Sequence, residues 1–506
     1  MLKDITELKM FRKHNLKVSV YEDRKSLGLA AAMDVADCIK DLLNYKKKIR
    51  IIFAAAPSQV EFLEELLNIE GINWEKIEVL HMDEYIGLQE DSPNLFSKFI
   101  KDNVTSKVKV KSVSYINGST ENVELEVKRY TELLKEDIDI VCLGIGENGH
   151  IAFNDPPVAD FKDDKLVKIV ELDEKCRQQQ VNDGCFESLA KVPTHAITLT
   201  IPMLMRGKYL FCMVPGSSKT DAVKAVLNNP VDESCPATIL RKHENARLYL
   251  DKESYGMSVT GEYLGKVVRH LEMIEAEEHD KIMVAAKMVA EQIKLNKLIY
   301  AYGPGGHSNL GSQEIFFRAG GLMHVSAILD EGTLLSGGAL RSMAVERTPG
   351  YAKIVLDDYG LKEGDLLIII NAYGINSATI DAALEAKKRG IKTIGVTSVK
   401  HAELTPKTHV ARHPSKKNLS ELVDVVLDCK IKVGDAVINI EGLEQKVAAM
   451  STFANAFILN SMVAETINLL VKEGIKPPIW MSGNATGGDE WNNQFISQFK
   501  GKIKKL

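Results

Sequence analysis

The chain has 506 residues, more than one ordinary hydrophobic core holds, so we expect two or more domains. It is 45% hydrophobic and 26% charged, with a formal net charge of −5, which is typical of a soluble globular protein. The mild acidity argues against nucleic-acid binding, because no basic stripe with interleaved aromatic residues is present in the sequence. We find neither an apolar run of membrane-spanning length nor a signal peptide behind Met1, so the sequence predicts a cytoplasmic protein without membrane contact.

The cysteines indicate a reducing compartment. There are seven of them, an odd number, and they are scattered without a C-x-x-C motif. This pattern predicts free thiols in a cytoplasm, and neither a disulfide framework nor a zinc site. We accordingly expect no metal and no cofactor.

The first half alternates strand-like and helix-like segments, which predicts a mostly parallel sheet covered by helices. Residues 17–21 and 50–55 are expected strands, and residues 23–43 are an expected helix. The second strand leads into Ala56-Pro57-Ser58-Gln59 and another helix. Ser58 is a natural helix N-cap, and the free N–H groups of a helix start can hold an anion. Capping alone is the simpler interpretation.

The next strand, residues 77–82, runs straight into two carboxylates, Asp83 and Glu84. Adjacent side chains at the end of a strand diverge, so we expect one to face a pocket and the other the scaffold. A solvated acidic turn is the alternative.

The stretch 143–157 contains the densest chemistry of the first half. An apolar run, residues 138–145, predicts a buried parallel strand that ends in a glycine-rich turn. His150 then lies at the carboxyl end of a strand, where open α/β sheets bind their ligands. Asp155 follows, stiffened by two prolines, and a histidine with a carboxylate is a plausible acid/base pair. A tight turn with a surface histidine fits the spacing equally well.

Two basic residues follow on the same half. Arg177 lies in the segment 173–179, and Lys219 lies in Pro215-Gly216-Ser217-Ser218-Lys219-Thr220, which opens a helix after the expected strand 209–214. This turn lacks the spacing of a nucleotide P-loop, but small residues, a helix start and a lysine suit a single phosphate. Taken singly, each basic residue is more often only a surface residue.

Four sequence blocks occur in one order and carry a family resemblance. They are 82–88 (MDEYIGL), 146–156 (GENGHIAFNDP), 192–198 (VPTHAIT) and 216–219 (GSSK). Over about residues 10–253 the chain resembles the glucosamine-6-phosphate deaminase family and, more distantly, the 6-phosphogluconolactonases. The resemblance implies a modified Rossmann-like fold and conversion of glucosamine 6-phosphate to fructose 6-phosphate and ammonia.

The resemblance also implies roles for individual residues. Asp83 would move a proton between C2 and C1 of the sugar, and His150 would assist opening of the pyranose ring. Asp155 aligns with a glutamate that supports the histidine, and Asn148 stands where the family usually has an aspartate. The residues expected to bind the substrate, mainly its phosphate, are Ser58, Gln59, Glu84, Arg177 and Lys219.

Three departures from the family pattern leave the substrate open. Asn148 cannot stabilise a charged histidine as a carboxylate can, and Asp155 is one methylene shorter than the family's glutamate. The usual glycine-rich phosphate loop is replaced by residues 54–59. Another amino-sugar phosphate, or a catalytically weak regulator that binds phosphosugars, therefore remains an alternative.

The second half begins with an expected charged helix, residues 262–295. A strand, residues 298–302, enters the glycine-rich turn 303–312, and residues 365–397 form a complete βαβ unit. Both turns open helices, so an anion could lie between them. Helix capping is the alternative.

This half resembles the sugar isomerase (SIS) domain family, in particular an uncharacterised stand-alone branch. The matching blocks are 306–308 (GHS), 317–321 (FRAGG), 346–351 (ERTPGY), 386–390 (AKKRG), 412–415 (RHPS), 434–436 (GDA) and 487–490 (GGDE). The resemblance implies a three-layer α/β/α domain that binds phosphosugars and frequently dimerises.

The phosphate turn of the SIS family, usually Ser-x-Ser-Gly, is replaced here by residues 371–374 (NAYG). Ser308, Ser377 and Thr379 could compensate for the lost hydroxyls as substrate-binding residues. Glu314 is a candidate base for an isomerisation, although a carboxylate on a helix surface is the simpler interpretation, and His307 is equally ambiguous.

The sequence therefore predicts a two-domain α/β enzyme. Residues 1–253 form a deaminase-like domain and residues 258–506 form the SIS domain. We expect a phosphosugar substrate and a homo-oligomer, a dimer through the SIS domain. The alternatives are a phosphosugar-binding regulator and a bifunctional enzyme in which both domains act on one amino sugar.

Overall fold

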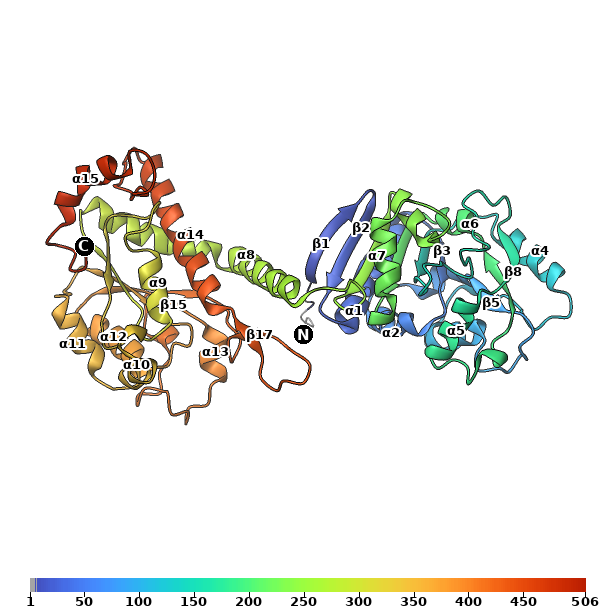
Figure 1. Cartoon of the computed structure of the whole chain (residues 1–506), viewed down its shortest axis with the longest axis horizontal. Helices are drawn as coiled ribbons and strands as arrows, with labels where there is room; N and C mark the ends of the chain where they lie inside the picture. The colour runs from blue at the N-terminus through green and yellow to red at the C-terminus, as the bar shows by residue number, and fades with distance from the viewer. Residues whose placement is uncertain (1–4, 6) are drawn as a thin grey trace. The chain divides into compact units, whose positions relative to one another are not determined.

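The computed structural model describes residue 5 and residues 7–506, and these divide into two compact units, residues 1–265 and 266–506 (Figure 1). The predicted domain junction, residues 253–258, lies a few residues before this division. Helix α8 (Val259–Lys294) begins before the division and has most of its length in the second unit.

The first unit is built on an eight-stranded sheet with the order β1-β2-β11-β10-β7-β3-β4-β6. All neighbouring strands are parallel except β1, which is antiparallel to β2. The strands are β1 (Glu7–Lys13), β2 (Leu16–Tyr21), β3 (Ile49–Phe53), β4 (Ile77–His81), β6 (Ser112–Ser114), β7 (Ile140–Leu143), β10 (Tyr209–Val214) and β11 (Ala246–Asp251). The predicted mostly parallel sheet is confirmed.

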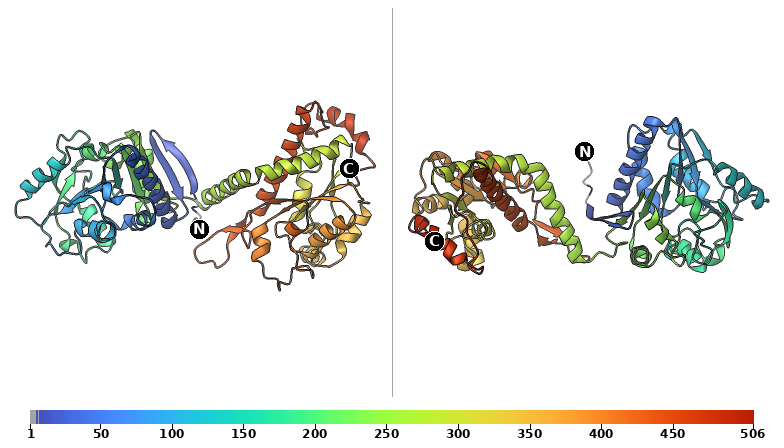
Figure 2. Two further views of the ribbon diagram at one scale, coloured as in Figure 1. Left: turned by 180° about the vertical axis from the view of Figure 1, so that it is seen from behind. Right: turned by 90° about the horizontal axis from the view of Figure 1, so that it is seen from above.

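Both faces of this sheet are covered, which explains why the central strands β7 and β10 are apolar throughout. In β3, Ile49, Ile51 and Phe53 pack into one hydrophobic cluster, and Ile52 points to the other. The first cluster contains residues of α1 and α2, and the second contains residues of α4, α6 and α7. Figure 2 shows the helices around the sheet in two further views. The helices of this unit are α1 (Arg24–Tyr45), α2 (Val60–Asn68), α3 (Phe96–Ile100), α4 (Val123–Leu133), α5 (Glu174–Asn182), α6 (Ile201–Met205) and α7 (Thr220–Asn228).

A small antiparallel sheet stands beside the large one and has the order β5-β9-β8. It consists of β5 (Asp83–Tyr85), β8 (Val167–Glu171) and β9 (His195–Leu199). Only Met82 separates β4 from β5, so the chain leaves the large sheet and enters the small one within a single residue. Asp83 lies at this junction, opposite Thr198 of β9.

The second unit has a five-stranded parallel sheet with the order β13-β12-β14-β15-β16. Its strands are β12 (Ile299–Tyr302), β13 (Val325–Ile328), β14 (Leu366–Ile370), β15 (Lys392–Thr397) and β16 (Val425–Asp428), and a separate hairpin joins β17 (Ala436–Ile438) to β18 (Val447–Ala449). Helices α11 and α12 pack on one face, and α9 and α14 pack near Ile370 on the other. The unit is thus the predicted three-layer α/β/α domain.

The helices of the second unit after α8 are α9 (Ser308–Glu314), α10 (Ala339–Glu346), α11 (Tyr351–Asp358), α12 (Ser377–Lys388), α13 (Val399–Leu404), α14 (Ser451–Lys472) and α15 (Gly488–Phe499). The predicted βαβ unit is β14-α12-β15. Helix α12 starts three residues earlier than the sequence indicated, at Ser377, with Asn376 preceding it.

Helix α14 corrects the expectation that no apolar run reaches membrane-spanning length. By length and composition it qualifies, with a mean hydropathy of 1.3. In this structure, however, 44% of that window is buried within the protein, and the Thr466 hydroxyl donates to the carbonyl of Ala286 on α8. Helix α14 thus packs against α8 along part of its surface.

Candidate active site

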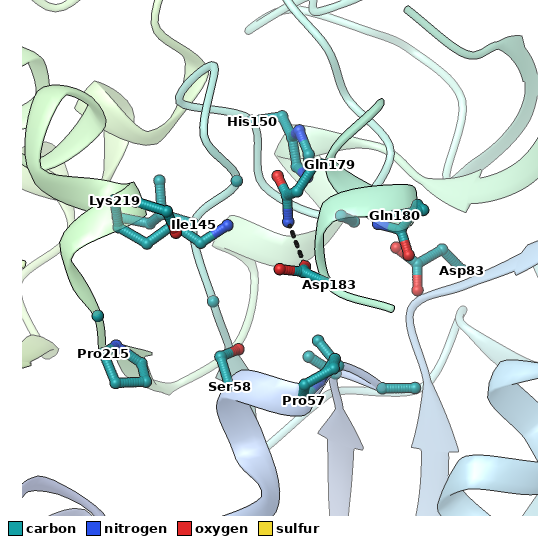
Figure 3. A pocket seen from close by; sticks show the side chains of 18 of the residues that line it. Pro57, Ser58, Asp83, Ile145, His150, Gln179, Gln180, Asp183, Pro215 and Lys219 are labelled. Atoms are coloured by element: carbon teal, nitrogen blue, oxygen red, sulfur yellow. Dashed lines mark hydrogen bonds between the residues drawn. The ribbon is translucent and has the colours of Figure 1, made fainter. Parts of the chain in front are cut away.

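A pocket of about 160 Å³ lies at the carboxyl ends of β3, β4, β7 and β10 in the first unit (Figure 3). Each of these strands contributes the residues that directly follow it: 54–58 after β3, 82–83 after β4, 144–146 after β7 and 215–219 after β10. Parallel strands bring their carboxyl ends to one edge of the sheet, which explains why motifs far apart in the sequence meet here.

Asp83 and Glu84 diverge. Asp83 lines the pocket and is only 6% exposed, and burial, reinforced by the charge of Glu84, raises its pKa well above the usual value. Glu84 points into the scaffold. Its Oε1 accepts hydrogen bonds from the backbone N–H groups of Tyr85 and Phe96, both at 3.0 Å, and its Oε2 accepts one from Ser97 at 2.8 Å. The expectation that Glu84 binds substrate is corrected, because both of its oxygens hold the start of α3.

His150 lines the pocket and is oriented by two side chains. Its Nδ1 lies 2.7 Å from Oδ1 of Asn148 and 2.9 Å from Oδ1 of Asp155. Both of these oxygens accept from the ring, so we assign the Nδ1 proton and leave Nε2 as an acceptor. Gly146 makes room for the ring, because a Cβ at this position would lie 2.1–2.4 Å from three ring atoms.

Asp155 is fully buried behind the histidine. Its Oδ1 accepts from Nδ2 of Asn148 at 2.9 Å, and its Oδ2 accepts from the backbone N–H of Asp173 at 3.2 Å. Burial by itself acts to raise the pKa of Asp155, but the hydrogen bond and charge of His150 and the hydrogen bond of Asn148 hold it below its usual value. The carboxylate therefore stays charged and fixes the ring.

Asn148 has a role that only an amide can fill. Its oxygen accepts from the histidine while its nitrogen donates to Asp155. An aspartate here would set two carboxylates against each other. The pair Asn148–Asp155 thus supplies one charge and a complete hydrogen-bond chain to His150, and the departure from the family pattern does not by itself disable the histidine.

Lys219 stands across the pocket from Asp83 (Figure 3). It is 6% exposed, and its Nζ has no hydrogen-bond partner among the described residues; the Glu147 carboxylate is 4.0 Å away. Burial lowers the pKa of Lys219, and the charges of Asp183 and Glu147 oppose that effect. A buried ammonium without a hydrogen bond favours binding of an anion that can accept one.

Ser58 also lines the pocket, whereas Gln59 does not. The Gln59 amide nitrogen donates to Oγ of Ser58 at 3.1 Å and to the carbonyl of Met213 at 3.4 Å. Gln59 therefore positions the serine and ties the turn to β10.

Arg177 is not part of the pocket, which corrects its expected place in a phosphate clamp. Its Nη2 donates to the carbonyls of Leu189 and Val192, at 2.7 and 2.9 Å, and so holds the loop after α5. The same helix instead sends Gln179 and Gln180 to the pocket wall.

Asp183 and Arg24 also line the pocket and were not predicted. Gln179 donates to Asp183 at 3.2 Å, as Figure 3 shows. Neither residue belongs to a recognised motif, and only Asp183 has a sequence signal near it, the stretch Gln178-Gln179-Gln180.

Three side chains that could bind a metal ion, including His150, lie close together beside the pocket. Each contributes one possible ligand atom, and these three atoms, from His150, Asp155 and Cys176, lie within 4.8 Å of one another. Cys176 is in the first turn of α5 and is buried, and this burial together with Asp155 raises the pKa of its thiol well above the usual value.

The second unit holds a separate polar cluster at the carboxyl ends of β12 and β14. Nδ2 of Asn371 lies 3.1 Å from Oγ of Ser308 and 3.4 Å from Oε1 of Glu346. Burial raises the pKa of Glu346 to about 7, against the opposing effects of Asn371 and Arg347. The Gly305 backbone is so close that a Cβ there would lie 2.8 Å from the Glu346 carboxyl. Glu346 was not predicted as a site residue, although it lies in the block 346–351 that resembles the SIS family.

The other residues predicted for this half differ in burial and in their hydrogen-bond partners. Ser377 and Thr379 are buried at the start of α12, and Oγ1 of Thr379 has no hydrogen-bond partner in the part of the chain that the structure describes. Glu314, the expected base, is held elsewhere: its Oε1 pairs with Arg318 at 3.2 Å and accepts from Asn460 at 3.0 Å. His307 is exposed directly before α9.

Comparison with known proteins agrees with this division. Residues 22–249 match the family of glucosamine-6-phosphate isomerases/6-phosphogluconolactonase, and residues 262–398 match the SIS domain. The UPF0309 protein of Thermoanaerobacter pseudethanolicus is 35% identical over 249 residues, which cover 48% of this chain and 99% of that relative. The UPF0309 protein of Halalkalibacterium halodurans is 37% identical over 244 residues, covering 48% and 96%.

Solved structures resemble about half of the chain. A monomeric glucosamine-6-phosphate deaminase is 29% identical with a TM-score of 0.44, covering 48% of this chain and 99% of that one. The 6-phosphogluconolactonase of Thermotoga maritima is 20% identical with a TM-score of 0.39, covering 47% and 100%.

The fold and the family matches define a two-domain α/β protein in which a domain of the glucosamine-6-phosphate isomerase/6-phosphogluconolactonase type precedes a SIS domain. The chain covers 99% and 96% of two UPF0309 relatives at 35 and 37% identity, and it therefore belongs to the UPF0309 family.

Proposed function

We propose that the first unit is an amino-sugar-phosphate deaminase, with glucosamine 6-phosphate as its leading substrate and fructose 6-phosphate and ammonia as products. One observation carries the proposal. A single pocket holds the buried ammonium of Lys219, which has no hydrogen-bond partner among the described residues, together with the carboxyl group of Asp83 and the oriented ring of His150. A phosphosugar has a dianion at one end and exchangeable protons at the other, which is the charge pattern that this pocket complements.

The phosphate would bind at Lys219 and Ser58. The ammonium supplies charge, the Ser58 hydroxyl supplies a hydrogen bond, and the turn 215–219 supplies backbone N–H groups. Arg177 has no part in this arrangement, since it is committed to two carbonyls.

The reaction then uses the other end of the pocket. His150 accepts the ring hydroxyl proton at Nε2 and returns it to the ring oxygen, which opens the pyranose. Asp83 removes the proton from C2 and delivers it to C1, while the aldehyde oxygen at C1 gains a proton and the ammonium group at C2 loses one. This leaves a hydroxyl at C1 and a protonated imine at C2. Water adds to this imine and ammonia leaves. These steps need only proton transfers by a carboxylate and a neutral imidazole.

The raised pKa of Asp83 describes the pocket without substrate. A base must be deprotonated, and the positive amino group of the substrate next to Asp83 would favour the charged carboxylate. Binding of an amino sugar would thus switch Asp83 into its active form, and a sugar without the amine would not.

The test measures ammonia and fructose 6-phosphate released from glucosamine 6-phosphate, with 6-phosphogluconolactone as a second substrate. Asp83→Asn should abolish release, whereas Asp102→Asn, at an exposed carboxylate of the same unit, should leave it unchanged. Turnover retained in Asp83→Asn would refute the assigned role. Hydrolysis of the lactone without ammonia release would assign the first unit to lactonase chemistry instead.

The second unit, we propose, binds a phosphosugar through the cluster of Ser308, Asn371 and Glu346, with the Thr379 hydroxyl at the start of α12 as a further group that binds it. The supporting observation is the buried Thr379 hydroxyl, which has no partner among the described residues. Thr379→Val keeps the shape of the side chain and removes only the hydroxyl. It should weaken the thermal shift that fructose 6-phosphate induces in the full chain without lowering the melting temperature of the free protein.

A regulator without catalysis is the second candidate for the whole chain, and it rests on residues 371–374, which lack the serines of the family's phosphate turn. Phosphosugar-induced thermal shifts in a folded protein that releases no product from any amino-sugar phosphate would favour it. Ammonia release that depends on Asp83 would exclude it.

Two expectations from the sequence stay proposals. A dimer through the second unit is supported by exposed apolar side chains such as Leu340, Ile354 and Val410, exposed by 79, 65 and 82%. Light scattering on the purified chain measures its mass directly, and a monomer would refute the dimer. A cytoplasmic location, and functional domains at 1–253 and 258–506, also remain predictions.

A further inference from the structure

Three metal-ligand side chains of different chemistry converge behind the pocket. They are the imidazole of His150, the carboxylate of Asp155 and the thiol of Cys176, with one ligand atom of each within 4.8 Å of the others. Two separate chain segments contribute them: the loop after β7 and the first turn of α5. Asp155 and Cys176 are buried, and His150, whose side chain is 11% exposed, also reaches the pocket.

The surrounding hydrogen bonds hold the three donors in place. Asn148 Nδ2 and the backbone N–H of Asp173 fix the two oxygens of Asp155. Gly146 allows the imidazole ring to lie flat against the backbone, since a side chain there would collide with it. Ligands fixed by neighbours in this way lose little conformational freedom when they bind a metal.

The donor set selects the kind of cation. Nitrogen, oxygen and thiolate sulfur together suit Zn²⁺ and similar thiophilic divalent ions, whereas Mg²⁺ and Ca²⁺ prefer oxygen ligands alone. The charges also balance: an aspartate, a thiolate and a neutral imidazole around a divalent ion sum to zero, which is the favourable state for a buried group of charges.

We propose that His150, Asp155 and Cys176 form a binding site for Zn²⁺ or a similar thiophilic divalent cation, and that occupation of this site inhibits the first unit. The cation takes Nδ1 of His150, the atom that now bonds to Asn148 and Asp155. The inhibition rests on the proposed function, because it follows from the loss of the histidine's acid/base role. The binding itself does not.

Binding of the cation displaces protons from two of its ligands. The Cys176 S–H bond breaks when the sulfur–metal bond forms, and its proton passes to solvent. The imidazole gives up its Nδ1 proton to solvent and takes one at Nε2, so it remains neutral. One proton is therefore released for each cation bound, and no electron is transferred.

Binding is tested on the full-length chain after removal of metals, without any sugar present. Co²⁺ serves as a spectroscopic probe, because cobalt bound to a thiolate gives a charge-transfer band in the near ultraviolet. The wild type should show this band at one equivalent and release one proton per ion, measured by calorimetry in buffers of different ionisation enthalpy.

Two cysteine variants decide the ligand. Cys176→Ser should lose the cobalt band and bind Zn²⁺ more weakly than the wild type, by more than the roughly 10–100-fold that loss of an outer-shell partner costs. Cys185→Ser removes a half-buried thiol that follows the same helix, and it should keep both the band and the affinity. Cys176→Ala repeats the test if the serine variant is unstable.

The proposal is overturned if the wild type gives no thiolate–cobalt band, or if Cys185→Ser loses it as Cys176→Ser does. Where ammonia release is measurable, Zn²⁺ should inhibit the wild type reversibly, a chelator should restore activity, and Cys176→Ser should resist inhibition. Metal binding without any turnover refutes the proposed deaminase alone. Turnover that is insensitive to bound Zn²⁺ refutes the inhibition alone.

Discussion

Asn148→Asp tests how His150 is oriented. The change replaces the Asn148 nitrogen, which now donates to Asp155 over 2.9 Å, with a second carboxylate oxygen. Loss of a hydrogen bond to a charged group costs about 1.5–3 kcal/mol. If both carboxylates stayed charged at that distance, their repulsion at an effective dielectric constant of about 20 would be about 6 kcal/mol. The free energy of unfolding should therefore fall by about 2–4 kcal/mol at pH 8, because the pair avoids the full repulsion by holding one proton.

The pH dependence distinguishes this cause from general damage. A carboxyl group whose pKa is raised in the folded state binds its proton more tightly there than in the unfolded chain. The destabilisation should accordingly be small near pH 4 and grow as the pH rises toward 8. Urea unfolding at several pH values measures this.

The matched control is Asn468→Asp. Asn468 also donates to a carboxylate, that of Glu465 at 3.1 Å, but on an exposed helix surface. Solvent screens that pair, so the effect should stay below about 1 kcal/mol. Equal losses in the two variants, or a loss in Asn148→Asp that does not change with pH, would refute the argument that a buried amide is required beside Asp155.

Three further predictions concern other groups. Lys219→Met should raise KM for the phosphosugar about 10–100-fold, the value of a lost hydrogen bond to a charged group. It should leave the melting temperature unchanged or higher, since the buried ammonium has no hydrogen-bond partner among the described residues. A KM equal to that of the wild type would contradict this prediction. Gly146→Ala should lower kcat about 100-fold or more by displacing the His150 ring, with a smaller effect on KM, which steady-state kinetics would show. Glu346 should make the wild type less stable as the pH rises from 4.5 to about 7, by at most about 3 kcal/mol, and Glu346→Gln should remove this slope in urea titrations.

The sequence by itself determined which elements form and where the chemistry lies along the chain. Apolar runs such as residues 138–145 and 365–370 predicted the central strands, because strands covered on both faces are apolar throughout. The segments that directly follow the predicted strands marked Ser58, Asp83, His150 and Lys219, and the structure brings all four to one pocket. The sheet does this automatically, since parallel strands place their carboxyl ends along one edge.

Only the tertiary structure decided in which direction each side chain points. Asp83 and Glu84 are neighbours with the same chemistry, yet one lines the pocket and the other caps α3, because that helix start lies on one side of β5. Arg177 satisfies two carbonyls of a loop more than ten residues further along the chain, which no local pattern reveals.

Long-range packing also created groups that the sequence did not indicate. Glu346 meets Asn371 and Gly305 across three separate segments, and its raised pKa exists only because they bury it. Cys176 joins His150 and Asp155 although the cysteines have no metal-binding spacing along the chain. A motif records residues that are close in sequence, whereas burial and partner choice depend on residues that folding brings together, so these features required the three-dimensional structure.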